Sequence, residues 1–126
     1  NYVLVCVSSL FCAFILTIFF MIVLKLNFNF ANMIAIPLLF SLGVSYPIYF
    51  IKRFDELGDF KKLFSSNTPL AILFSGLTTI FSFSTLFFSS HNGTSSMGLL
   101  LFISLSSTLI TSLILLPIFI KIFRIK

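Results

Sequence analysis

The sequence predicts an all-α membrane protein: an antiparallel bundle of four transmembrane helices with one short interfacial amphipathic helix. Of its 126 residues 59% are hydrophobic and only 9% are charged, whereas an ordinary soluble domain carries about 25% charged residues. Mean hydropathy is +1.18. The apolar residues fall into four uncharged runs, each long enough to cross about 30 Å of hydrocarbon. These observations exclude a soluble fold and predict a single transmembrane bundle over residues 1–126.

The four apolar runs predict where the membrane spans lie. We expect spans at about residues 3–24, 31–51, 69–88 and 97–120. The connections are short, so consecutive spans run antiparallel, and the Asn92-Gly93 pair predicts a turn between the last two. The chain begins at Asn1 and enters an apolar run almost at once, without the features of a removable signal peptide. We therefore expect a piece of a longer protein.

The connector over residues 52–67 contains the only concentration of charge between spans. Its apolar residues recur at roughly helical spacing, with acidic and basic residues between them: Phe54, Leu57, Phe60 and Phe64. This pattern predicts a short amphipathic helix on the membrane surface. The helix could be a docking site for another protein, but a solvated connector pinned by its phenylalanines is the simpler interpretation.

The distribution of basic residues predicts that both termini are cytoplasmic. Four of the eight Lys and Arg residues lie between Lys52 and Lys62, and three lie after Ile120. The two remaining loops together carry only Lys25. Because cytoplasmic loops carry the excess of Lys and Arg, the two basic segments are placed on the cytoplasmic side. The same distribution argues against a nucleic-acid partner, since the charges flank apolar runs instead of covering one face.

Hydroxyl side chains distinguish the third and fourth spans from the first two. In the third span they form a predicted hydroxyl face: Thr78, Thr79 and Ser82. In the fourth they repeat every fourth residue as a predicted helix-packing stripe: Ser104, Thr108 and Ser112. A hydroxyl in lipid bonds its own backbone or a neighbouring helix, and small residues allow close approach. We therefore expect the third helix to face protein and the fourth to pack closely.

Two stretches resemble the resistance-nodulation-division (RND) exporter superfamily, of the MMPL type, and within it the hopanoid-transporter branch. The resemblance is carried by PLL-x3-GV-x3-IYF followed by a basic residue, by SGLTT, and by SSHNGTSSMG before an apolar run, within residues 29–54 and 72–101. It implies the last four helices of one six-helix transmembrane half, in a bacterial inner membrane. The substrate class it implies is hopanoid-like hydrophobic lipid.

The resemblance also implies a position for the residue that couples such pumps to protons. These exporters use an acidic residue in the fourth helix of each half, and by the motif it falls at Pro47, or at Ser45 in the wider superfamily. Neither position is acidic, so Ser45, Tyr46 and Pro47 form a former coupling position, which Thr78 and Thr79 are expected to face. A phenol titrates near pH 10 and cannot replace the acid. We therefore expect a truncated or degenerate segment that is not proton-coupled by itself.

Two other function classes remain open from the sequence. A small structural or interaction subunit would only pack against other membrane proteins through its Ser/Thr stripes. A small autonomous multidrug-type transporter would need a membrane-embedded Glu in its first helix, and residues 3–24 contain none. No catalytic nucleophile, metal cluster or cofactor motif is present, so we expect neither an enzyme nor a cofactor. Expected partners are membrane lipids and either the remaining parts of an RND-type transporter or a second copy of the chain.

Overall fold

The computed structural model describes residues 2–27 and 29–122, which fold into helices and short connections. The elements are α1 (Tyr2–Val23), α2 (Phe30–Leu57), α3 (Phe60–Ser65), α4 (Thr68–Ser84), the 3-10 helix η1 (Thr85–Phe88), α5 (Asn92–Ile110), the π-helix η2 (Thr111–Leu115) and α6 (Leu116–Ile122). Four stretches are long and apolar enough to cross a membrane: Tyr2–Val23, Phe30–Leu57, Thr68–Phe88 and Asn92–Ile122. The expected all-α fold with four long apolar helices is confirmed.

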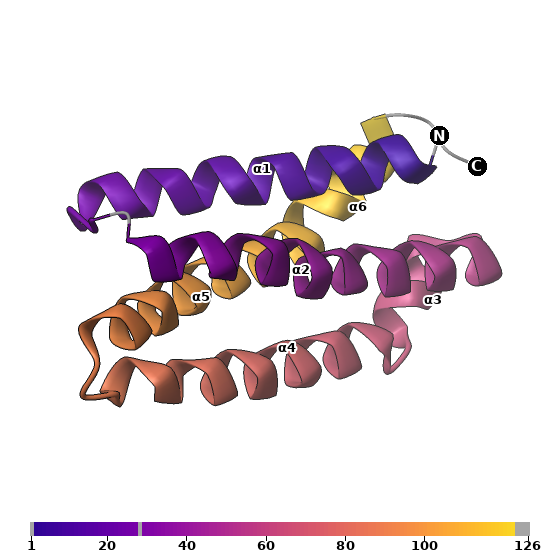
Figure 1. Cartoon of the computed structure of the whole chain (residues 1–126). Coiled ribbons are helices and arrows are strands. Elements are labelled where there is room, and N and C mark those ends of the chain that lie inside the picture. The colour runs from indigo at the N-terminus through magenta and orange to yellow at the C-terminus, as the bar shows by residue number, and fades with distance from the viewer. Residues whose placement is uncertain (1, 28, 123–126) are drawn as a thin grey trace.

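Consecutive long helices run in opposite directions along a common axis (Figure 1). The start of α1, the α2–α3–α4 junction and α6 lie together at one end of the bundle. The Tyr2 hydroxyl donates a hydrogen bond of 2.8 Å to Asp55, which joins the start of α1 to the last turns of α2. The connector's basic residues therefore share one end with Lys121, and Lys25 lies at the other. The remaining basic residues of the tail, Arg124 and Lys126, lie outside the described residues.

Helix α5 forms the centre of the bundle and packs against α1, α2 and α4. Its buried side chains cover most of the helix circumference, and several are fully covered, such as Leu101 and Leu105, while Phe102 and Ile110 remain exposed. By contrast, α1 exposes large apolar side chains along its outer face, including Phe11 and Phe19. A helix that is apolar on its outer face as well as its inner face suits a lipid surrounding. The arrangement is one central helix whose neighbours expose apolar side chains on their outer faces.

The charged connector differs from the predicted amphipathic helix. Helix α2 continues through the first charged residues to Leu57, and the chain breaks at Gly58, whose φ is +64°. Glycine adopts this left-handed conformation without steric cost, which explains the stop. A separate short helix, α3, follows, and the Phe54 and Phe60 rings stack with centroids 4.4 Å apart. The prediction of one helix through Phe54, Leu57, Phe60 and Phe64 was therefore wrong, and Phe54 packs into the bundle core.

The predicted turn at Asn92-Gly93 was also wrong, because both residues lie in the first turn of α5. Reversal of the chain occurs earlier, through η1 and residues 89–91. The Ser95 hydroxyl donates to the carbonyl of Phe87 across this reversal at 2.8 Å. This hydrogen bond ties the first turns of α5 to the end of η1. Helix α5 therefore begins at Asn92, before the apolar run that predicted the span.

A π-helical segment interrupts the last long helix. Residues Thr111–Leu115 form η2, between α5 and α6, and Pro117 follows in the first turn of α6. Proline lacks an N–H and cannot complete the α-helical hydrogen bond to the carbonyl of Leu113. A local π turn is a common way for a helix to absorb such a defect. The expected fourth span is thus a continuous helical stretch that consists of α5, η2 and α6.

Gly98 is the tightest backbone contact in the fold and gives a test of the packing. A Cβ at Gly98 would lie 2.6 Å from the backbone nitrogen of Phe87 and 2.8 Å from the carbonyl carbon of Leu86. Backbone atoms cannot rotate away, so we expect Gly98→Ala to lower the free energy of unfolding by about 1–3 kcal/mol. The measurement is loss of helical circular dichroism in detergent micelles during titration with a denaturing detergent.

Gly93→Ala is the matched control, because it is also a glycine in α5 but its Cβ would meet only the Ala31 side chain at 3.5 Å. Alanine gains about 1 kcal/mol of intrinsic helix preference over glycine at both sites. We expect Gly93→Ala to be neutral or mildly stabilising. Equal destabilisation by both substitutions would contradict the packing described here.

Candidate functional site

The middle of α2 forms the centre of the candidate site. Gly43, Tyr46 and Pro47 are buried, and Tyr46 is only 5% exposed. The Ser45 hydroxyl is half-buried and donates to the carbonyl of Leu42 at 2.6 Å. Pro47 removes the helical partner of the Gly43 carbonyl, yet α2 remains helical from Phe30 to Leu57. The former coupling position is therefore a packed, uncharged segment of a continuous helix.

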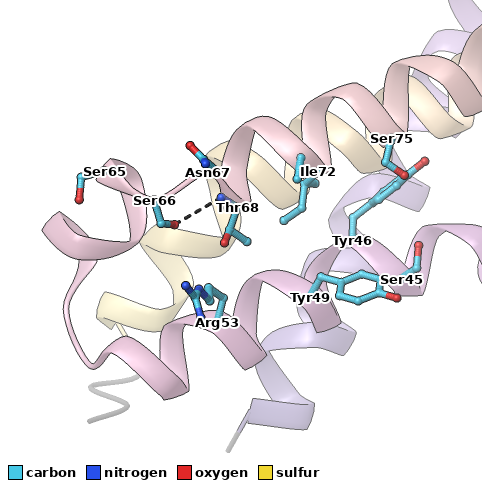
Figure 2. A pocket seen from close by; sticks show the side chains of 11 residues that line it. Ser45, Tyr46, Tyr49, Arg53, Ser65, Ser66, Asn67, Thr68, Ile72 and Ser75 are labelled. Carbon is cyan, nitrogen blue, oxygen red and sulfur yellow. Dashed lines mark hydrogen bonds between the residues drawn. The ribbon is translucent and has the colours of Figure 1, made fainter.

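Tyr46 connects the former coupling position to α4. It shares the buried core with Ile72 and Ile80 of α4 and has the Thr79 side chain near its hydroxyl, and Figure 2 shows the ring extending from α2 toward Ser75. Thr79 is half-buried, and its own hydroxyl donates to the Ser75 carbonyl at 2.8 Å. The structure thus brings Thr79 beside Tyr46.

The rest of the predicted hydroxyl face points away from the other helices of the chain. Thr78 and Ser82 are exposed. Thr78 donates to the carbonyl of Ser75, and Ser82 donates to that of Thr78, each at 2.8 Å. The expectation that these hydroxyls contact protein is therefore not met within this chain, and Thr78 does not join Thr79 at Tyr46. Local hydrogen bonding to the helix backbone satisfies both donors without a neighbour.

The predicted packing stripe lies in the centre of the bundle. Ser104, Thr108 and Ser112 are each at most 2% exposed. Thr108 donates to the Leu105 carbonyl at 2.9 Å, which leaves its methyl group for packing. A Cβ at Gly43 would lie 3.1 Å from Thr108 Cγ2, so α2 and α5 approach closely at this level. The stripe and the former coupling position therefore meet through Gly43 and Thr108.

An open pocket of about 700 Å³ extends from the former coupling position to the end of α2 (Figure 2). Its lining is Ser45, Tyr46, Tyr49, Arg53, Ser65, Ser66, Asn67, Thr68, Ala71, Ile72 and Ser75. Arg53 is the one charged side chain in this lining. The pocket lies between α2 and α4, with α3 at its charged end. It offers hydroxyl, phenol and guanidinium groups for binding and no carboxylate for proton transfer.

The described part of the chain offers no chemistry for catalysis or metal binding at this site. Residues 2–24 and 30–51 contain no Asp, Glu, His, Lys or Arg, and the same holds for 68–90 and 92–120. Among the described residues no three His, Cys, Asp or Glu side chains come close enough to hold a metal ion. The hydroxyl, phenol and guanidinium groups that line the pocket can bind polar groups of a ligand.

Sequence reasoning missed two residues near the site. Arg53 seemed only an orienting charge, because positive residues commonly end a span. Gly76 was not singled out, yet a Cβ there would lie 2.5 Å from Leu109 Cδ1. A glycine within an apolar helix is itself a signal of close helix approach, and this signal could have identified Gly76.

Comparison with known proteins gives two relatives of the same kind. The chain is 41% identical over 112 residues, 89% of its length, to the hopanoid transporter HpnN of Burkholderia multivorans. It is 43% identical over 88 residues, 70% of its length, to HpnN of Rhodopseudomonas palustris. The chain spans only 12% and 10% of these relatives. No family model matches the chain, and no solved structure gives a significant match.

The two tyrosines of the site provide a matched pair for testing its packing. Tyr46 is buried against α4, whereas Tyr49, one turn later, is 65% exposed. We expect Tyr46→Phe to cost about 0.5 to 1.5 kcal/mol of unfolding free energy, because it removes a hydroxyl that is buried between α2 and α4. Tyr49→Phe should cost less than about 0.5 kcal/mol. Detergent-denaturation curves of the two variants make the measurement, and equal losses would argue against a specific Tyr46 contact.

Proposed function

This chain is homologous to a membrane region of RND-type hopanoid transporters, and we propose that it forms the corresponding segment of an exporter of hydrophobic lipids. The observation that carries the proposal is 41% identity over 89% of the chain to one such transporter. Both relatives are transporters, and the chain is not an enzyme. Four long apolar helices agree with a multi-pass membrane segment. We propose that the assembled protein exports lipid and that this lipid is hopanoid-like.

We propose that this segment does not couple to protons by itself. A charged residue inside a membrane helix costs about 2.5–3.5 kcal/mol to insert, so its presence marks function. In α2 the first charged residue after Phe30 is Lys52, beyond the buried Ser45–Pro47 turn. The segment would therefore supply shape, through the α2–α5 contact and the pocket beside α4, while proton coupling would require an acidic residue elsewhere in the assembly.

The proposed partner is the remainder of an RND-type transporter. The chain accounts for about a tenth of its relatives' length, so most of a lipid path would be formed by other parts. The exposed hydroxyls Thr78 and Ser82 on α4 offer one face for such parts. Membrane lipids would cover the apolar faces of α1. We place the assembly in the bacterial inner membrane, with both ends of this segment in the cytoplasm.

The missing acid gives the most direct functional test. We expect that a chimera of the Burkholderia relative carrying this chain in place of its matching 112 residues exports hopanoid weakly. Pro47→Asp in that chimera should raise export at least about tenfold, because removing a general acid–base group typically costs 10²–10⁴-fold. Hopanoid export would be measured with and without a protonophore, and only the restored activity should be protonophore-sensitive.

Pro47→Asn is the matched control, since it restores the helical N–H and a similar shape without an ionisable group. It should leave export at the level of the unmodified chimera. A gain with Ser45→Asp but not with Pro47→Asp would move the coupling position by two residues. Strong protonophore-sensitive export by the unmodified chimera would contradict the proposal that the segment lacks coupling.

The proposed orientation has its own test. Alkaline phosphatase fused after His91 should be active, because the α4–α5 connection is expected outside the cytoplasm, and a fusion after Gly58 should be inactive. Green fluorescent protein fused at the same two sites should give the opposite pattern. Activity of phosphatase at Gly58 would invert the topology.

A further inference from the structure

The charged end of the pocket between α2 and α4 has the composition of an anion site. Arg53 lies on the α2 wall, and the opposite wall is the first turn of α4, which begins at Thr68 (Figure 2). Ser65, Ser66 and Asn67 complete this end. We propose that this pocket binds the phosphate of an anionic glycerophospholipid headgroup. The proposal goes beyond the function proposed above and does not depend on transport.

Arg53 has hydrogen-bonding capacity left for a ligand. Its Nη1 pairs with Glu56 at 2.7 Å, and both side chains are about half exposed, at 43% and 51%. Its Nε is buried and has no acceptor among the residues that the structure describes. An exposed ion pair three residues apart contributes little, so a phosphate can compete with Glu56. The buried Nε has no surface for a ligand in the pocket, so a phosphate would form charge-assisted hydrogen bonds with the exposed end of the guanidinium.

The opposite wall favours negative charge as well. The 17-residue helix α4 places the positive end of its dipole at the pocket, and its first turn contains no acidic residue. Thr68 N lies 3.4 Å from Ser66 Oγ, a long contact that an entering oxygen could replace. No acidic residue is among those that line the pocket. Asp55 and Asp59 are engaged elsewhere, by the Tyr2 hydroxyl and the Lys61 backbone N–H.

The position of the pocket selects a lipid as the source of the phosphate. One end of the pocket is lined by residues at the junction of α2, α3 and α4, where the spans meet the charged connector and headgroups are expected. Tyr49 lines the pocket, is 65% exposed and can contact the first carbons of an acyl chain. Lys61 and Lys62 of α3 add positive charge at this end. A headgroup here would have its tails beside the exposed ring of Tyr49.

Native mass spectrometry of the full chain released from detergent micelles tests the site. The probes are dioleoylphosphatidylglycerol, dioleoylphosphatidylcholine and inorganic phosphate, each offered separately and then in competition. We expect one phosphatidylglycerol to be retained in preference to phosphatidylcholine. Arg53→Gln should reduce retention about tenfold, as expected for one lost charge-assisted pair. Arg53→Lys keeps the positive charge but loses the bidentate N–H donors of the guanidinium, so its retention of phosphatidylglycerol should lie between that of the unmodified chain and that of Arg53→Gln.

Lys52→Gln is the matched control, because Lys52 is the adjacent residue with the same charge and lies outside this pocket, beside Val3 and Cys6. It should change retention by less than about twofold. Helical circular dichroism of each variant checks folding, and Arg53→Lys serves as the decisive variant if Arg53→Gln does not fold. Equal losses for Lys52→Gln and Arg53→Gln, equal retention of phosphatidylcholine, or displacement of the lipid by inorganic phosphate would each overturn the lipid assignment.

Discussion

Close approach of helices to α5 is the constraint on which the rest of the structure depends. Within a bilayer, burial of apolar surface gives little preference for a neighbouring helix over lipid, so association rests on tight packing. Here a glycine or small hydroxyl side chain lies at each contact: Gly43 against Thr108, Gly76 against Leu109, and Gly98 against the backbone of Leu86 and Phe87. These contacts position α2 and α4, and so place Tyr46 beside Thr79 and form the pocket between the two helices.

The segment proposed as the former coupling position is uncharged and lies inside a continuous helix, α2. An intramembrane carboxylate would cost about 2.5–3.5 kcal/mol to insert, so its absence makes α2 easier to place in lipid. What remains is a buried Pro47, a buried Tyr46 and a Ser45 hydroxyl bonded within its own helix. None of these three side chains is a carboxylic acid, and only the Ser45 hydroxyl bonds to its own helix.

The sequence predicted the four long helices because their apolar runs are long and uncharged. A bilayer requires about 20 such residues in each spanning helix, so the pattern is easy to recognise. The sequence predicted the ends of these helices poorly. Whether Lys52 and Arg53 end a helix or extend it depends on Gly58, whose left-handed φ was not evident from the charge pattern. Asn92-Gly93 became helical because Ser95 bonds back to Phe87, a contact made only in the folded chain. The buried stripe of α5 was visible as a four-residue repeat, but the pocket depends on how α2 and α4 diverge, which no local pattern encodes.

Several hydroxyl side chains of α5 are buried within the bundle, whereas several of those on α4 are exposed. In α5 the hydroxyls of Ser104 and Thr108 are buried and bond to their own backbone, so they permit close packing on the face that meets Gly43 of α2. In α4 the same local bonding occurs at Thr78 and Ser82, but these residues are exposed. Because these hydroxyls already donate to carbonyls of their own helix, this face of α4 can lie against lipid or against another protein. The face of α4 is therefore where further helices can add to this segment without repacking its core.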